Sequence, residues 1–132
     1  GPGMNLDRLN PVDLAFLGDG YYELTVRRLM LERGWTGSDR LHRETVRYVC
    51  AENQAHAVKT LLPGLTPEEQ DLCRRARNRK SSTRPKNADP VDYKWATALE
   101  ALIGSLVLAG NSMRAEELVH QAVDAIDRRG TK

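Results

Sequence analysis

The chain has 132 residues, 29% of them charged, and a net charge of +2, which suits one small globular domain. No apolar run is long enough to span a membrane and no secretory segment is found, so we expect a cytoplasmic protein, or a stromal one if the source is a plant plastid. Two cysteines, Cys50 and Cys73, are too few for a disulfide scaffold, and we expect buried thiols rather than a disulfide. We take residues 1–3 as an expression remnant and residues 4–132 as a single domain without an appended module.

The first predicted helix spans residues 10–33. Asn10 can cap it, Pro11 suits its first turn, and Asp13 favours the positive end of the helix dipole. Hydrophobic side chains at helical spacing predict an apolar face. That face would comprise Leu14, Leu17, Tyr21, Leu24 and Leu31.

Two glycines, Gly18 and Gly20, lie inside this helix and flank Asp19. Each glycine costs roughly 1 kcal/mol relative to alanine in a helix interior. We therefore expect a neighbouring helix or a ligand to approach the backbone closely here. Because residues four apart share a helical face, Asp19 is expected beside Ala15 and Glu23.

The second predicted helix spans residues 38–62 and is stopped by the following Pro63 and Gly64. The third begins with a capping box from Thr66 to Glu69 and runs out into residues 80–87, which lack periodicity and are expected to form a loop. His42 and His56, in the second helix, are expected to be surface or packing residues rather than ligands.

The fourth predicted helix, residues 89–109, is apolar around most of its circumference and should be central. Glu100 is a costly residue on such a helix unless it has a partner such as a metal ion. Gly104 follows one turn later and permits close packing. A last helix begins at Ser112 and ends before Gly130. Five helices without a strand pattern predict an all-α bundle.

A basic block spans residues 74–86 of an otherwise acidic chain, and no acidic residue interrupts it. Such a block is a candidate site for a polyanion, although a solvated charged helix face is the alternative. Its seven basic residues are Arg74, Arg75, Arg77, Arg79, Lys80, Arg84 and Lys86.

Two motifs resemble the signatures of the ribonuclease III family. The first is the run Phe16-Leu17-Gly18-Asp19, and the second is Leu99-Glu100-Ala101-Leu102-Ile103-Gly104. The intervening Arg77-Asn78 and Pro85-Lys86-Asn87, with Leu41-His42-Arg43 and Gln54-Ala55, resemble the Mini-ribonuclease III branch, which has the catalytic domain without the double-stranded RNA-binding domain. The resemblance covers about residues 10–126. It implies a ribonuclease III-type helical bundle that pairs into a symmetric homodimer.

The resemblance also implies a Mg²⁺-dependent endoribonuclease that cleaves double-stranded RNA and leaves 5′-phosphate and 3′-hydroxyl ends. The branch trims precursor 23S ribosomal RNA in ribosome biogenesis, and a ribosomal protein could assist. Asp19 and Glu100 match the family's catalytic, metal-binding carboxylates, and Mn²⁺ could replace Mg²⁺. We expect RNA contacts from the basic block and its neighbours, namely Arg74, Arg77, Asn78, Arg79, Lys80, Thr83, Arg84, Lys86 and Asn87.

The chain departs from the larger family at two positions. Ala15 and Thr97 stand where that family has two further acidic residues. We therefore expect one well-held Mg²⁺ ion, with any second ion recruited mainly by substrate phosphate. Thr97 and Glu23 are auxiliary candidates. Glu23 would either order a metal-bound water or remain a surface residue.

Three other functions are open. The same departures suit a non-catalytic RNA-binding dimer of this fold acting in ribosome assembly. Glu117 and His120 form one Glu-x-x-His pattern of the kind found in di-iron bundles, but such bundles need a second copy, which the sequence lacks. A structural helical adaptor is the third alternative.

Overall fold

The computed structural model describes residues 9–79 and 88–129. These residues form six α-helices and one short 3₁₀ turn, with no strand among them, so the all-α prediction is confirmed. The helices are α1 (Pro11–Glu32), α2 (Ser38–Val49), α3 (Ala51–Leu61), α4 (Pro67–Asn78), α5 (Pro90–Leu108) and α6 (Ser112–Arg129), and the turn η2 (Leu62–Gly64) follows α3.

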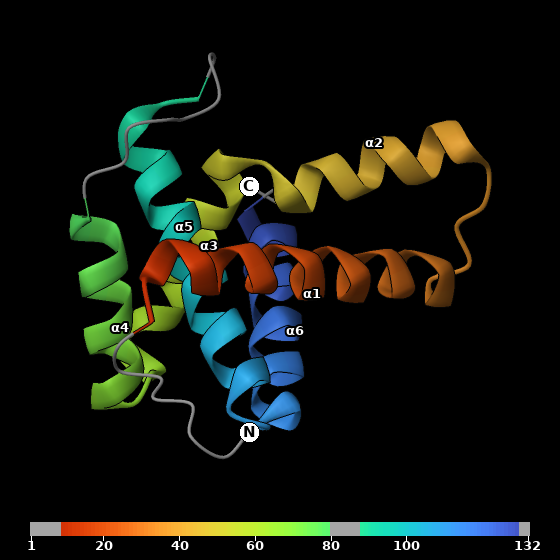
Figure 1. The fold of residues 1–132 in the computed structure, drawn as a ribbon. Helices are drawn as coiled ribbons and strands as arrows, with labels where there is room; N and C mark the ends of the chain where they lie inside the picture. The colour runs from red at the N-terminus through yellow and green to blue at the C-terminus, as the bar shows by residue number, and fades with distance from the viewer. Residues whose placement is uncertain (1–8, 80–87, 130–132) are drawn as a thin grey trace.

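The centre of the bundle is α5, as its apolar sequence predicts. It packs against α1, α3, α4 and α6, and Figure 1 shows α1 crossing in front of α5 and α6. Leu99, Leu102 and Ile103 of α5 are at most 1% exposed. α2 returns alongside α1 as a hairpin that extends beyond the bundle (Figure 1). This arrangement buries α5 and leaves one side of α1 open.

The second predicted helix is broken at Cys50, so the prediction of five helices is wrong. Cys50 is extended, with φ −68° and ψ 149°, and separates α2 from α3. The break frees main-chain carbonyls that find other donors: Asn53 Nδ2 donates to Arg47 O at 2.8 Å, and the Tyr22 hydroxyl donates to Tyr48 O at 2.8 Å. No proline or glycine lies between residues 38 and 62, so no local signal marks the break.

The buried face of α1 also differs from the predicted stripe. Leu24 and Leu31 are 65% and 61% exposed, Leu17 and Tyr21 are half-buried, and only Leu14 of the predicted face is buried. The helix turns Gly18 toward α5, because a glycine allows the closest approach of two backbones. The buried residues are Pro11, Leu14, Ala15, Gly18, Tyr22, Thr25, Val26 and Met30.

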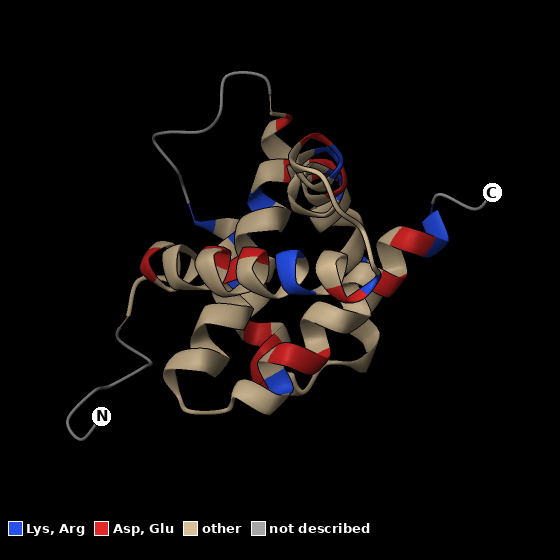
Figure 2. Ribbon diagram, turned by 90° about the vertical axis from the view of Figure 1, so that its right-hand side faces the viewer, with Lys and Arg blue, Asp and Glu red and all other residues tan. Residues whose placement is uncertain are grey.

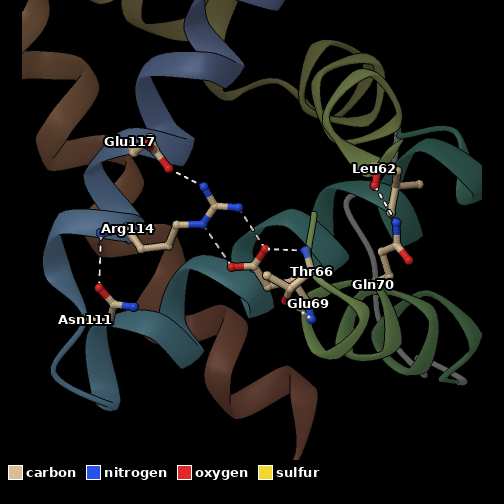
Figure 3. A network of polar contacts seen from close by, with 7 residues as sticks. All are labelled: Leu62, Thr66, Glu69, Gln70, Asn111, Arg114 and Glu117. Carbon is tan, nitrogen blue, oxygen red and sulfur yellow. Dashed lines mark hydrogen bonds and ion pairs between the residues drawn. The ribbon is translucent and has the colours of Figure 1, made fainter. Parts of the chain in front are cut away.

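The predicted capping box at the start of α4 is confirmed and extends to α6. Thr66 Oγ1 accepts from the Glu69 amide at 3.1 Å, and Glu69 Oε1 accepts from the Thr66 amide at 2.9 Å. The same carboxylate accepts two bonds from Arg114 of α6, at 2.9 and 3.0 Å, and Arg114 also pairs with Glu117 (Figure 3). Glu69 therefore joins the first turns of two helices that are far apart in sequence.

Both cysteines are free thiols, and a disulfide between them is not formed. Cys73 is buried, and burial raises its pKa to about 12, so it is unreactive at neutral pH. None of the described helices combines the length and hydropathy needed to cross a bilayer.

Candidate active site

The site is built on the crossing of α1 and α5, where two glycines bring the helix backbones into contact. A Cβ at Gly18 would lie 1.7 Å from Glu100 O, and a Cβ at Gly104 would lie 1.9 Å from Leu14 O. The expected close approach is therefore found at Gly18 and Gly104. No atom of another element lies within 4 Å of the would-be Cβ at Gly20, so no neighbouring helix makes a close approach there.

The crossing brings Asp19 and Glu100 together, although 81 positions separate them in the sequence. Both carboxylates line one pocket of about 430 Å³. Asp19 is exposed at its surface, whereas Glu100 is half-buried. Other polar residues of the lining are Arg79, Tyr93, Lys94 and Thr97.

Burial and a neighbouring carboxylate dominate the electrostatics of Glu100. Burial, and then the neighbouring Asp19, raise its pKa to about 9, and the charge of Glu23 adds to this effect. The Gln54 amide acts in the opposite direction and lowers the pKa. In the absence of a cation, the Glu100 carboxyl group therefore holds its proton at neutral pH.

Gln54, on α3, influences Glu100, and the sequence did not indicate this relationship. It is 2% exposed and interacts with Glu100, yet its Nε2 makes no hydrogen bond of normal geometry within the described residues. Tyr22 also lies near Glu100, but its hydroxyl is committed to Tyr48 O at 2.8 Å. The sequence analysis used Gln54-Ala55 as part of the resemblance to the family, but this pattern did not indicate that Gln54 lies near Glu100.

The two auxiliary candidates lie in different places. Thr97 lines the pocket, and its Oγ1 donates to Tyr93 O of the same helix at 2.9 Å. Glu23 instead lines a separate groove between α1 and α2, together with His42, and pairs with Arg27 at 3.0 Å. Glu23 therefore influences Glu100 through space without lining the pocket.

The basic residues of α4 separate into two groups. Arg79 lines the pocket, as does Lys94 of α5, which the sequence analysis did not select. Arg77 lies over the Trp95 ring with its guanidinium carbon 4.9 Å from the ring centroid, and its Nε donates to Asn78 Oδ1 at 3.1 Å. Among the described residues, the cations that line the pocket are thus Arg79, directly after α4, and Lys94 of α5.

Arg74 lies outside the pocket and pairs with Asp71 at 2.5 Å. Figure 2 shows acidic and basic residues interspersed along the described helices rather than segregated by sign. The remaining predicted RNA contacts lie outside the described residues, and they are Lys80, Thr83, Arg84, Lys86 and Asn87.

The donor set suits a hard divalent cation. No group of three or more His, Cys, Asp or Glu side chains close enough to hold a metal ion occurs in residues 9–79 and 88–129. Two carboxylates are nevertheless enough for Mg²⁺, which keeps several waters and takes other ligands from substrate phosphate. The Asp19–Glu100 pair at the pocket fits this need.

The di-iron alternative finds no support at its own residues. Glu117 pairs with Arg114, and His120 lies 4.0 Å from Glu116 on the exposed face of α6. Neither side chain faces the carboxylates of the pocket.

Comparisons with known proteins agree with this geometry. Residues 12–111 match the model of the Ribonuclease III domain. The Mini-ribonuclease 3 of Symbiobacterium thermophilum is 48% identical over 91% of this chain and 92% of the relative, and that of Brevibacillus brevis is 45% identical over 89% and 88%. The crystal structure of a Fusobacterium nucleatum protein is 30% identical, with a TM-score of 0.78 over 89% of this chain and 93% of that one. The chain belongs to the ribonuclease III family of endoribonucleases.

Proposed function

We propose that the chain is a Mg²⁺-dependent endoribonuclease that cleaves double-stranded RNA at the Asp19–Glu100 pair. The observation that carries this proposal is the pair itself: two carboxylates from crossing helices line one open pocket, where burial and Asp19 raise the pKa of Glu100. Membership of the ribonuclease III family supports the same substrate class.

Asp19 and Glu100 would hold the cation, and Mn²⁺ could replace Mg²⁺ there. The chemistry that such an ion supplies when bound is activation of a water and stabilisation of the leaving oxygen. Arg79 and Lys94 line the same pocket and would neutralise phosphate charges next to the scissile bond. Thr97 supplies a hydroxyl where the larger family has a carboxylate. Because the pocket then has one acidic ligand fewer, we propose a single well-held ion.

The proposed substrate is a duplex in precursor 23S ribosomal RNA, in the cytoplasm, with 5′-phosphate and 3′-hydroxyl products. A ribosomal protein could assist the reaction. The names of the curated relatives, all Mini-ribonuclease 3, support this branch of the family. The substrate stem can be identified by sequencing the RNA ends that the purified protein creates in precursor ribosomal RNA.

A symmetric homodimer is the proposed functional unit. Exposed apolar side chains on α1 support it: Phe16, at the pocket, is 85% exposed, and Val12 is 45% exposed. Unpartnered apolar surface of this kind favours burial against another protein surface.

The test is cleavage of a long RNA duplex by the wild type and by Asp19→Asn and Glu100→Gln, in Mg²⁺ and in EDTA. We expect cleavage only by the wild type and only with Mg²⁺, with both variants folded by circular dichroism. Glu116→Gln, on the exposed face of α6, is the matched carboxylate control and should cleave normally. Duplex binding without cleavage in every sample would instead indicate a non-catalytic RNA-binding dimer.

A further inference from the structure

Gln54 carries the one buried side-chain nitrogen or oxygen without a hydrogen-bond partner within residues 9–79 and 88–129. Its side chain is almost completely enclosed, at 2% exposure. A buried amide donor that is left unpaired costs free energy, so native structures contain few of them. A hydrophobic residue of similar size would avoid that cost, and the presence of glutamine here therefore calls for a role outside packing.

The Gln54 side chain lies near the Glu100 carboxyl group and influences its pKa. Asp19 raises the pKa of this carboxyl group through a hydrogen bond and through its charge, and Glu23 raises it through its charge, whereas the nearby Gln54 side chain lowers it. The Tyr22 hydroxyl is occupied by Tyr48 O. The Gln54 amide is therefore the available neutral donor beside a carboxylate that has a role in the proposed metal site.

We propose that Gln54 is a positioning residue, whose amide donates to one Glu100 oxygen and holds that carboxylate in place to bind a divalent cation together with Asp19. The inference rests on the proposed function, because it concerns the same carboxylate pair. Gln54 would touch neither substrate nor cation. It would act through Glu100, as the hydrogen-bonding partners of metal ligands do.

The neutrality of the amide matters for this role. A lysine or arginine next to Glu100 would orient the carboxylate equally well, but its positive charge would offset the charge that attracts the cation. An aliphatic residue would leave the Glu100 carboxylate without this donor. A neutral N–H donor orients the carboxylate and leaves the negative charge of the pair undiminished.

The break between α2 and α3 fixes where Gln54 lies. Its main-chain amide donates to Cys50 O at 3.0 Å in the first turn of α3. The adjacent Asn53 anchors this turn, because it donates to Arg47 O at 2.8 Å and accepts from Arg129 of α6 at 2.9 Å. The two neighbouring amides therefore differ: Asn53 anchors α3, whereas the buried Gln54 Nε2 is unpaired.

The experiment measures Mn²⁺ binding by electron paramagnetic resonance, without RNA, for the wild type, Gln54→Leu and Gln54→Met. We expect both variants to bind Mn²⁺ at least about 10-fold more weakly than the wild type. Their melting temperatures in EDTA should equal or exceed that of the wild type, because the unpaired amide has been removed. Methionine is a second isostere that adapts to the space if leucine packs poorly.

Gln70→Leu is the matched control, since Gln70 uses its amide for a structural bond to Leu62 O at 2.7 Å, and this variant should keep wild-type Mn²⁺ affinity. Unchanged Mn²⁺ affinity in both Gln54 variants would overturn the inference, and so would a loss of stability in EDTA without a loss of affinity. If the wild type itself bound no Mn²⁺, the proposed metal site would fail first, and the two failures are therefore distinguishable.

Discussion

Gly18 of α1 lies against the main-chain carbonyl of Glu100 on α5, so closely that a Cβ at residue 18 would be 1.7 Å from that oxygen. This contact lies beside both carboxylates of the candidate site. Asp19 is the residue after Gly18, and Glu100 contributes both the contacted main-chain carbonyl and the second carboxylate. The distance between the carboxylates is therefore set by the backbone contact. A change that forces α1 and α5 apart will disturb stability and chemistry together.

Gly18→Ala should destabilise the protein by about 3 kcal/mol or more, because the methyl group meets main-chain atoms on a rigid helix and cannot be accommodated by a side-chain rotation. It should also lower RNA cleavage under conditions in which the protein remains folded. Urea denaturation followed by circular dichroism measures the first effect.

Gly20→Ala is the matched control two residues away. No atom lies within 4 Å of its would-be Cβ, so alanine should raise the free energy of unfolding by up to about 1 kcal/mol through helix propensity. If both substitutions changed the free energy of unfolding equally, α1 and α5 would be farther apart at Gly18 than this structure shows.

The pKa of Glu100 predicts how the metal-free protein responds to pH. The folded-state pKa of about 9 exceeds the ordinary value of 4.5, so the folded protein binds the extra proton between these two values. The contribution is fully present below pH 4.5 and is lost as pH rises through 9, so the free energy of unfolding should fall across this window. Denaturation in EDTA from pH 5 to 9 measures it.

Glu100→Gln should remove this part of the pH dependence, because glutamine does not titrate. The free energies of unfolding of the wild type and the variant, plotted against pH, should then diverge progressively toward pH 9. Parallel curves over that range would contradict a raised pKa at Glu100.

The Glu69–Arg114 pair predicts a loss of stability on the acid side (Figure 3). The Arg114 guanidinium holds the pKa of Glu69 below its usual value. This contribution is present above the ordinary pKa of 4.5 and is lost as pH falls through the lower folded-state value. Glu69→Gln should cost about 1–3 kcal/mol at pH 7 and should reduce the loss of stability below pH 4.5, both measured by denaturant titration.

Glu68→Gln is the control for that substitution. Glu68 is exposed in the same first turn of α4 and should change stability by less than about 1 kcal/mol. If the two substitutions had equal effects at pH 7, the link to α6 would contribute nothing measurable.

Local sequence patterns were sufficient for much of the fold and for selecting the two carboxylates that share one pocket. The central helix followed from the apolar run around Leu99, the start of α4 followed from Thr66 and its capping box, and the site carboxylates followed from two short motifs. Each of these signals lies within one helix. Helix propensity, capping and periodicity are local properties, and the chain obeys them here.

The features that the sequence did not indicate depend on contacts between distant residues. The break at Cys50 is stabilised by hydrogen bonds from the Tyr22 and Asn53 side chains. Both residue types are common in helices, so neither one signals a break in the sequence. Gln54 became a site residue only because α3 packs against α5. The exposed Leu24 and Leu31 were assigned to the core because their spacing suits a buried face, whereas the small residues of α1 determine which face α5 approaches.

Arg79 should contribute to RNA binding through the phosphate backbone. It lines the pocket next to the carboxylates, so Arg79→Ala should weaken duplex binding and lower the slope of log K against log salt concentration by about 1. Fluorescence anisotropy at several salt concentrations, in Ca²⁺ to prevent cleavage, measures both effects.

Arg75→Ala is the control for charge alone. Arg75 pairs with Asp71 at 3.0 Å and lies away from the carboxylates, so its removal should leave the slope nearly unchanged. A slope that fell equally in both variants would indicate nonspecific attraction by the whole of α4 rather than a contact at the pocket.

Phe16 should control self-association. It is 85% exposed at the edge of the pocket, and burial of such a side chain against a second copy would contribute about 2 kcal/mol for each subunit. Phe16→Glu should convert a dimer to a monomer in sedimentation equilibrium and should lower cleavage at low protein concentration.

Met113→Glu is the matched control, because Met113 is 88% exposed at the start of α6. If Phe16→Glu sedimented as the wild type does, the proposed interface would lie elsewhere. A shift to monomer with Met113→Glu alone would assign the interface to α6.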